Sequence, residues 1–163
     1  LRFLGSVPRR RVIQQCLQEN NIEGGRLELE LTESLLMEDT DEVSFQMEKL
    51  KALGIHMVLD DFGTGFSSLS YLQKFPFDGL KIDRSFIYDY PHYQGNIGLI
   101  KTIIAMGNAL NMTLVAEGVE TQDQADFLMR EGCNVFQGYL YGKPMTNGDF
   151  VLWLDENIHS VNA

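Results

Sequence analysis

The sequence is short of cysteine and histidine, and both shortages narrow the chemistry open to it. Its two cysteines, Cys16 and Cys133, stand far apart and form no CxxC pair, which argues against a disulfide framework and a cysteine zinc site. The three histidines are scattered and form no zinc cluster. We therefore interpret both cysteines as buried, reduced thiols in a protein of a reducing compartment.

Positive charge is also scarce, because 13 lysines and arginines face 23 aspartates and glutamates, for a formal net charge of −10. Such an acidic surface argues against non-specific binding to DNA and against docking on anionic lipid. The most apolar segment, residues 97–110, contains Lys101 and is shorter than the roughly 20 residues of a membrane span. No signal peptide is visible. We expect a cytoplasmic protein without a membrane segment of its own, or the cytoplasmic part of a membrane-anchored protein.

The 163 residues do contain a regular alternation of short strand-like runs and longer helical patterns. Strands are expected at residues 27–31, 55–59, 79–82, 112–116 and 134–138, and helices from Pro8 to before Gly24, at 41–53, 67–75, 96–110 and 121–130, and from residue 149. This pattern predicts the α/β class, a parallel sheet covered by helices. Two architectures fit, a (β/α)₈ barrel and an open doubly wound sheet. About five βα units are visible, fewer than a complete barrel requires.

Polar residues follow the apolar strands at their carboxyl ends. They are Glu30, Glu33, Asp60, Asp61, Lys81, Asp83, Glu117, Glu120 and Gln137. In a parallel sheet these ends share one face, and in barrels that face carries the active site. Clustered carboxylates repel one another unless cations neutralise them, and oxygen ligands suit Mg²⁺ or Mn²⁺. The adjacent Asp60 and Asp61 could hold two such ions, and a pair of ions can clamp the attacking and leaving oxygens in phosphodiester hydrolysis.

Each of these residues also has a structural interpretation. A single acid after a strand usually caps a helix or is solvated. Lys81 within an apolar strand is either paired in a salt bridge or catalytic, and we weigh the two equally. Gln137 could simply satisfy buried backbone groups. Their joint occurrence at consecutive strand ends favours a functional site.

Five strings carry a resemblance to a known family. They are ELTES at 30–34, DDFGTGFSS at 60–68, KIDRSF at 81–86, AEGVET at 116–121 and QGYL at 137–140. Together, in this order and spacing, they resemble the EAL-domain family of cyclic di-GMP phosphodiesterases. The resemblance runs from about residue 26 to residue 150.

The resemblance implies a modified TIM barrel, of which residues 1–163 form a partial domain, the C-terminal two-thirds. It implies Glu30, Asp60 and Asp61 as metal ligands, with Asp60 bridging. The other implied roles are Lys81 orienting the nucleophilic water, Glu117 as general base, Asp83 near the metal-bound water, Gln137 supporting the site and Glu33 steadying the loop after Asp61. That loop, residues 62–68, is implied to couple the site to the family's dimer interface.

The sequence departs from the family in lacking its Glu-Ala-Leu string, whose glutamate is a metal ligand, and a nearby substrate-binding arginine. The family's metal-binding asparagine would fall just before Leu1. At least two ligands of the two-metal site are therefore missing, and we interpret this as truncation because every motif residue that could be present is intact.

The leading hypothesis is Mg²⁺- or Mn²⁺-dependent hydrolysis of cyclic di-GMP to the linear dinucleotide, pGpG, in bacterial signalling. The alternatives are an inactive cyclic di-GMP receptor and a regulatory interaction module that binds no nucleotide. The resemblance also implies a homodimer, and fusion to upstream sensory or GGDEF-type domains.

Overall fold

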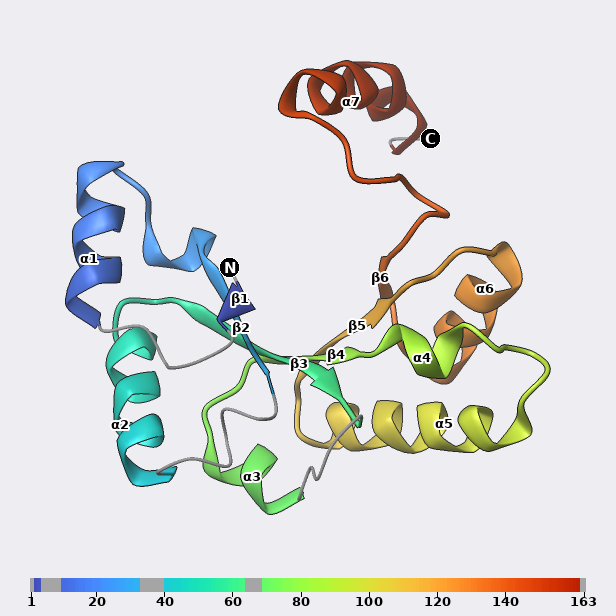
Figure 1. The fold of residues 1–163 in the computed structure, drawn as a ribbon, viewed down its shortest axis with the longest axis horizontal. Helices are drawn as coiled ribbons and strands as arrows, with labels where there is room; N and C mark the ends of the chain where they lie inside the picture. Colours follow the sequence, from blue (N-terminus) through green and yellow to red (C-terminus); the bar gives the residue numbers. More distant parts are fainter. Residues whose placement is uncertain (1, 4–9, 33–39, 64–68, 162–163) are drawn as a thin grey trace.

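The computed structural model describes residues 2–3, 10–32, 40–63 and 69–161, and a parallel sheet lies at its centre (Figure 1). The six strands lie in the order of the sequence: β1 (Arg2–Phe3), β2 (Glu28–Thr32), β3 (His56–Phe62), β4 (Gly79–Ile82), β5 (Thr113–Glu117) and β6 (Val135–Gln137). A doubly wound sheet reverses its strand order at a switch point, and this sheet does not. Within the described residues it is therefore an open, barrel-like sheet.

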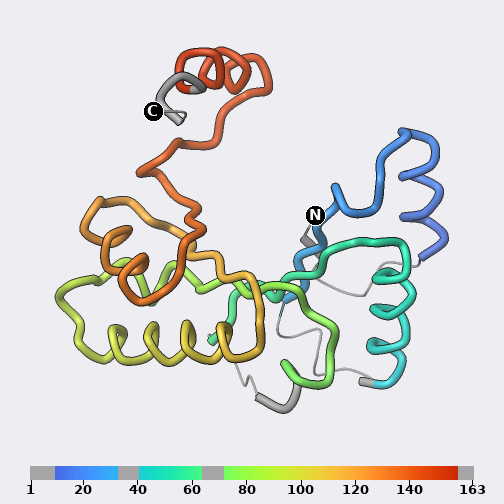
Figure 2. Tube along the Cα trace, turned by 180° about the vertical axis from the view of Figure 1, so that it is seen from behind, coloured from blue at the N-terminus to red at the C-terminus, as the bar shows by residue number. Residues whose placement is uncertain are grey.

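The helices fill the connections between parallel strands. They are α1 (Arg10–Glu19), α2 (Thr40–Lys51), α3 (Leu69–Lys74), α4 (Arg84–Ile87), α5 (Gln94–Ala109), α6 (Gln122–Glu131) and α7 (Asn147–Val161), with a 3₁₀ turn, η1, at Gly24–Arg26. Figure 1 shows α1, α2 and α3 beside the first strands and α4, α5 and α6 beside the last. Figure 2, from behind, confirms that α7 stands apart at the end of an extended segment.

Local sequence explains where α6 begins and ends. The hydroxyl of Thr121 accepts a hydrogen bond from the backbone N–H of Gln124, and the Gln124 side chain bonds back to Thr121, which completes a capping box. Gly132 ends the helix in the left-handed region at φ 100°, which glycine adopts without steric cost. The predicted helix boundary at this position is confirmed.

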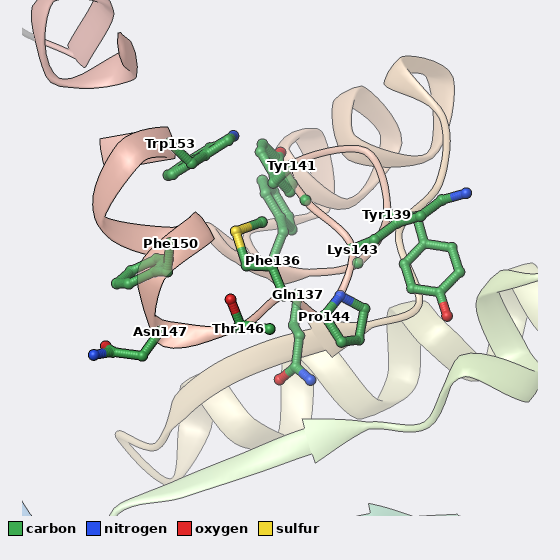
Figure 3. A pocket seen from close by; sticks show the side chains of 13 residues that line it. Phe136, Gln137, Tyr139, Tyr141, Lys143, Pro144, Thr146, Asn147, Phe150 and Trp153 are labelled. Atoms are coloured by element: carbon green, nitrogen blue, oxygen red, sulfur yellow. The ribbon is translucent and has the colours of Figure 1, made fainter. Parts of the chain in front are cut away.

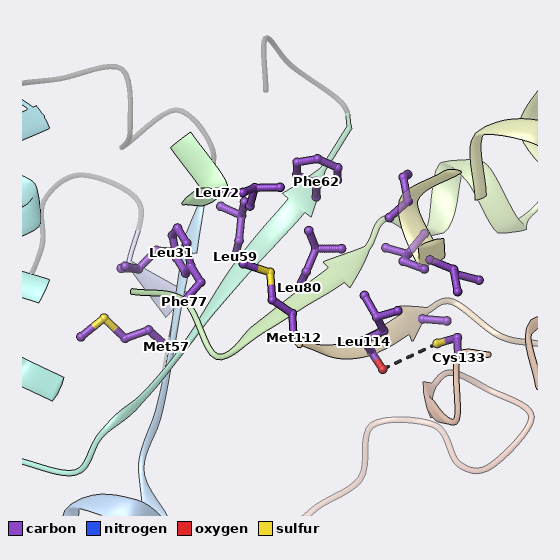
Figure 4. Packing of buried hydrophobic residues seen from close by; sticks show 14 of the residues in the cluster. Leu31, Met57, Leu59, Phe62, Leu72, Phe77, Leu80, Met112, Leu114 and Cys133 are labelled. Carbon is purple, nitrogen blue, oxygen red and sulfur yellow. Dashed lines mark hydrogen bonds between the residues drawn. The ribbon is translucent and has the colours of Figure 1, made fainter. Parts of the chain in front are cut away.

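The core lies where the strands meet the covering helices (Figure 4). Leu29, Leu31, Leu59, Leu80 and Ile82 of the strands are at most 1% exposed. Each such side chain contributes about 1.5–3 kcal/mol of burial free energy. The parallel sheet thus supplies a stiff base for the polar residues at its carboxyl edge.

The cysteine prediction is confirmed for one thiol and wrong for the other. Cys133 is buried, and its thiol lies 3.6 Å from the carbonyl oxygen of Leu114, to which it donates (Figure 4). Cys16 is exposed, and Ile13 is the residue of α1 that is buried.

No described helix combines the length and the apolar character that crossing a membrane requires.

Candidate functional site

Four neighbouring strands bring charged side chains to one place. Glu30 comes from β2, Asp60 and Asp61 from β3, Lys81 from β4 and Glu117 from β5. Lys81 is 5% exposed, yet its Nζ lies 2.5 Å from Oε1 of Glu117 and 2.8 Å from Oε1 of Glu30. Oδ1 of Asp60 lies 3.7 Å from the same nitrogen. The expected convergence at the strand ends is therefore present for these side chains.

Lys81 is charged because of its partners. Burial alone would lower its pKa, but the hydrogen bonds to Glu117 and Glu30, with the charge of Asp60, outweigh burial and raise it. The ammonium therefore persists at neutral pH and neutralises part of the carboxylate charge. A salt bridge and a role in chemistry are compatible here, because the same ammonium that pairs the acids also faces the site.

An irregularity in β3 explains how two consecutive aspartates share one site. Successive side chains of a regular strand point to opposite faces. The register with β4 shifts between Leu59 and Phe62, and Asp61 has a left-handed backbone at φ 56°. Such a bulge re-aims side chains, and it is common next to active sites. Asp60 and Asp61 can therefore face the same ligand despite being adjacent in sequence.

Three carboxylates form a group that could hold a metal ion. One oxygen from each of Asp60, Asp61 and Glu117 lies within 4.8 Å of the other two. Asp60 is 2% exposed, and a set of carboxylate oxygens is the donor set that hard divalent cations prefer. Among the described residues this group leaves out Glu30, whose Oε1 accepts a hydrogen bond from Lys81 instead. The residues present thus fit a divalent cation.

The remaining predicted site residues lie in other surroundings. The carboxylate of Asp83 caps α4, accepting hydrogen bonds from the backbone N–H of Ser85 at 3.0 Å and from its hydroxyl at 2.5 Å. Gln137 ends β6, pairs in register with Glu117 and is exposed. Glu33 and most of the loop at 62–68 fall outside the described residues.

Two cavities open around Gln137. One, of about 580 Å³, includes Glu117 and Gln137 and extends to Arg84, Tyr88 and Tyr139. The other, of about 620 Å³, lies between the segment after β6 and α7 (Figure 3). Figure 3 shows the amide of Gln137 pointing away from the rings of Phe136 and Tyr141, which stack with centroids 6.2 Å apart. The first cavity adjoins the acidic group, because Glu117 is part of its lining.

Sequence reasoning found Glu117 and Gln137 of that cavity wall but assigned no role to Arg84 and Tyr88. Arg84 begins α4 and Tyr88 follows its last residue; this single helical turn was not predicted. The spacing of Asp83 and Ser85 was a usable signal, because an aspartate two residues before a serine N–H is typical of a helix cap.

Comparison with known proteins identifies relatives of this chain. The family model of the EAL domain matches residues 6–144. A bifunctional diguanylate cyclase/cyclic di-GMP phosphodiesterase, MucR of Pseudomonas aeruginosa, is 45% identical over 133 residues, which are 82% of this chain and 19% of MucR. The chain thus spans about a fifth of the length of that relative.

Solved structures agree with the sequence match. PaMucR phosphodiesterase in a c-di-GMP complex has a TM-score of 0.82 and 43% identity, over 86% of this chain and 57% of that one. The EAL domain of Mycobacterium smegmatis DcpA has a TM-score of 0.84 and 35% identity, over 90% and 66%. A calcium/cy-diGMP complex of Klebsiella pneumoniae BlrP1 has a TM-score of 0.77 and 27% identity, over 83% and 34%.

Proposed function

The chain belongs to the EAL domain family, and from that membership we propose that it is part of a metal-dependent phosphodiesterase that hydrolyses cyclic di-GMP to linear pGpG. One observation carries the proposal. Asp60, Asp61 and Glu117 form an acidic group that fits a divalent cation, and Lys81 contacts two of the three at the carboxyl edge of the sheet. A charged site of this composition suits a phosphodiester, which carries negative charge through the reaction.

In this proposal Asp60, Asp61 and Glu117 would hold Mg²⁺ or Mn²⁺, and Glu30 would be a further ligand. Such ions, when bound, polarise a phosphoryl oxygen and lower the pKa of water. The calcium complex of BlrP1 supports a divalent cation, since that protein carries one together with the dinucleotide. The choice of Mg²⁺ or Mn²⁺ rests on the oxygen donor set.

The chain's own residues have distinct proposed roles. The ammonium of Lys81 orients the attacking water and offsets the negative charge that develops on the phosphate. Glu117 accepts the proton from that water. Asp83 and Gln137 support the site from its rim. Glu33 is proposed to steady the loop that follows Asp61.

The wider organisation is also part of the proposal. Residues 1–163 would form the carboxyl-terminal two-thirds of an EAL domain, which the 66% coverage of the DcpA domain supports. Fusion to other signalling domains is supported by the bifunctional name of MucR. A homodimer and a cytoplasmic location complete the proposal.

A receptor that binds cyclic di-GMP without hydrolysing it is the second candidate. The observation that favours it is the position of Lys81, whose ammonium already pairs with Glu30 and Glu117. In a receptor that charge would hold the carboxylates together without a cation, whereas an enzyme needs the cation for turnover.

The test is hydrolysis of cyclic di-GMP by the natural full-length protein, with Mg²⁺, with Mn²⁺ and with chelator, followed by chromatography. We expect pGpG in either metal, none in chelator, and a loss of at least a hundredfold in Asp60→Asn, about 3 kcal/mol of the barrier. Asp78→Asn is the control, because Asp78 pairs with Lys51 away from the acidic group. Binding without product, unaffected by chelator, would identify a receptor.

A further inference from the structure

We propose that Gln124 is a positioning residue that fixes the wall of the substrate cavity against the metal-binding edge of the sheet. The inference rests on the proposed function. It extends that proposal by assigning a positioning role to a residue outside the acidic group. Gln124 lies in the first turn of α6 and is 5% exposed, one of the few buried polar side chains in the described chain.

One amide joins three backbone groups from two separate segments. Oε1 of Gln124 accepts hydrogen bonds from the N–H of Glu120 at 2.8 Å and of Thr121 at 3.1 Å. Its Nε2 donates to the carbonyl oxygen of Ile87, at the end of α4, at 3.2 Å. A capping box explains only the bond to Thr121. The other two bonds tie the loop after β5 to α4.

The loop after β5 packs closely against α4. Gly118 has φ 67°, and a Cβ on it would lie 2.5 Å from Cβ of Arg84 in α4. On the other side, the N–H of Val119 donates to the carbonyl oxygen of Gln137 at 3.1 Å, and the N–H of Leu140 donates to the carbonyl oxygen of Val119 at 3.0 Å. The loop after β5 is thus held between α4 and the end of β6.

These three segments are also the walls of the 580 Å³ cavity, which includes Arg84, Tyr88, Glu117, Gly118 and Gln137. Glu117 is placed by the pairing of β5 with β4 and β6. The wall on α4 lies beyond the end of β4, outside the sheet, and Gln124 ties it to the loop after β5. Loss of that tie would move Arg84 and Tyr88 relative to Glu117 while leaving the metal-binding carboxylates in place.

The critical variant is Gln124→Glu, assayed at pH 8, because it keeps the acceptor for Glu120 and Thr121 but replaces the donor to Ile87 by a second acceptor. Gln122→Glu is the matched control on the same helix, since the exposed side chain of Gln122 donates to Asp126 at the surface. Gly118→Ala is an independent second variant, because its methyl group would push Arg84 away and leave the capping box intact.

Three quantities are measured on the natural full-length protein: Mn²⁺ affinity, hydrolysis of bis(4-nitrophenyl) phosphate, and the Kd for cyclic di-GMP in Ca²⁺. We expect Gln124→Glu and Gly118→Ala to raise that Kd about tenfold, the effect of one unsatisfied buried group. In Gln124→Glu, Mn²⁺ affinity and turnover of the small diester should stay within twofold of wild type, because they need only the acidic group.

Equal weakening of Mn²⁺ binding, hydrolysis and dinucleotide binding would overturn the inference, since a purely structural role weakens all three together. An unchanged Kd would also overturn it. A wild-type protein that binds cyclic di-GMP but hydrolyses neither substrate would contradict the enzyme proposal alone. The Kd values of the variants would then still test the role of Gln124. A wild-type protein that does not bind cyclic di-GMP would sink both.

Discussion

The ammonium of Lys81 lies 2.5 Å from the carboxylate of Glu117, across the parallel pair β4–β5, and both side chains are largely buried. This contact joins the centre of the sheet to the edge that carries the proposed chemistry. Glu30 and Asp60 add two more negative charges around the same nitrogen. One ammonium therefore faces three carboxylates, so it offsets only part of their negative charge, and the stability of the site depends on that ammonium.

Replacing Lys81 by methionine tests this dependence. The apolar volume is retained, but Glu30 and Glu117 lose their shared partner, and we expect the free energy of unfolding to fall by about 2–4 kcal/mol. Added Mn²⁺ should recover part of the loss, because a divalent ion restores positive charge. Urea unfolding with and without Mn²⁺ measures both effects.

Lys101→Met is the matched control, because Lys101 pairs with Glu131 at 2.8 Å but is half exposed. We expect Lys101→Met to change the free energy of unfolding by less than about 1 kcal/mol. Equal losses in the two variants would show that Lys81 has no special role in the charge balance.

Ionisation of the Asp78 carboxyl should contribute to the pH dependence of the free energy of unfolding. Burial opposes ionisation of its carboxyl, but hydrogen bonds from Lys51 and from the N–H of Met57 outweigh burial and lower the pKa of Asp78 below its usual value. A lowered carboxyl pKa contributes stability above its unfolded value, and that contribution disappears as pH falls through the folded value. Asp78→Asn should therefore cost about 1–2 kcal/mol at pH 7.

The difference between wild type and Asp78→Asn should narrow as pH falls below about 4, which urea unfolding at a series of pH values would measure. Asp41→Asn serves as the control, since Asp41 is exposed in its pair with Lys74, and little change is expected. A difference that stays constant to pH 2 would mean that ionisation of Asp78 is unimportant.

Two glycines should respond in opposite directions to alanine. A Cβ at Gly138 would lie 2.1 Å from the carbonyl oxygen and 2.3 Å from the nitrogen of Val119, both backbone atoms that cannot move aside. Gly138→Ala should thus lower the free energy of unfolding by more than about 2 kcal/mol. Gly98, in α5, has nothing within 4 Å, so Gly98→Ala should raise it by about 0.5–1 kcal/mol. Thermal denaturation of both variants gives the comparison, and destabilisation by Gly98→Ala would contradict the packing described.

Periodicity alone was enough for the long elements. The five expected strands and the helices from α1 to α3 and from α5 to α7 appear within a few residues of their predicted bounds, because burial on a sheet face or helix face leaves a pattern in the sequence. β1 and α4 were missed because two and four residues are too few to show a period.

The site was harder to predict because its decisive features are not periodic. Alternation along β3 would send Asp60 and Asp61 to opposite faces, and only the bulge brings them together. The partners of Lys81 lie 51 residues before it and 36 residues after it in the numbering, at Glu30 and Glu117, so the pairing depends on the strand order. The tie made by Gln124 is likewise a contact between segments.

The most direct test of the account is anomalous diffraction from crystals of the natural protein grown with Mn²⁺. The account predicts a Mn²⁺ peak within about 2.5 Å of carboxylate oxygens of Asp60 and Asp61, with Glu117 beside it. Mn²⁺ bound only elsewhere, with Lys81 still paired to Glu117 and Asp60, would contradict the proposal that this edge of the sheet is a metal centre.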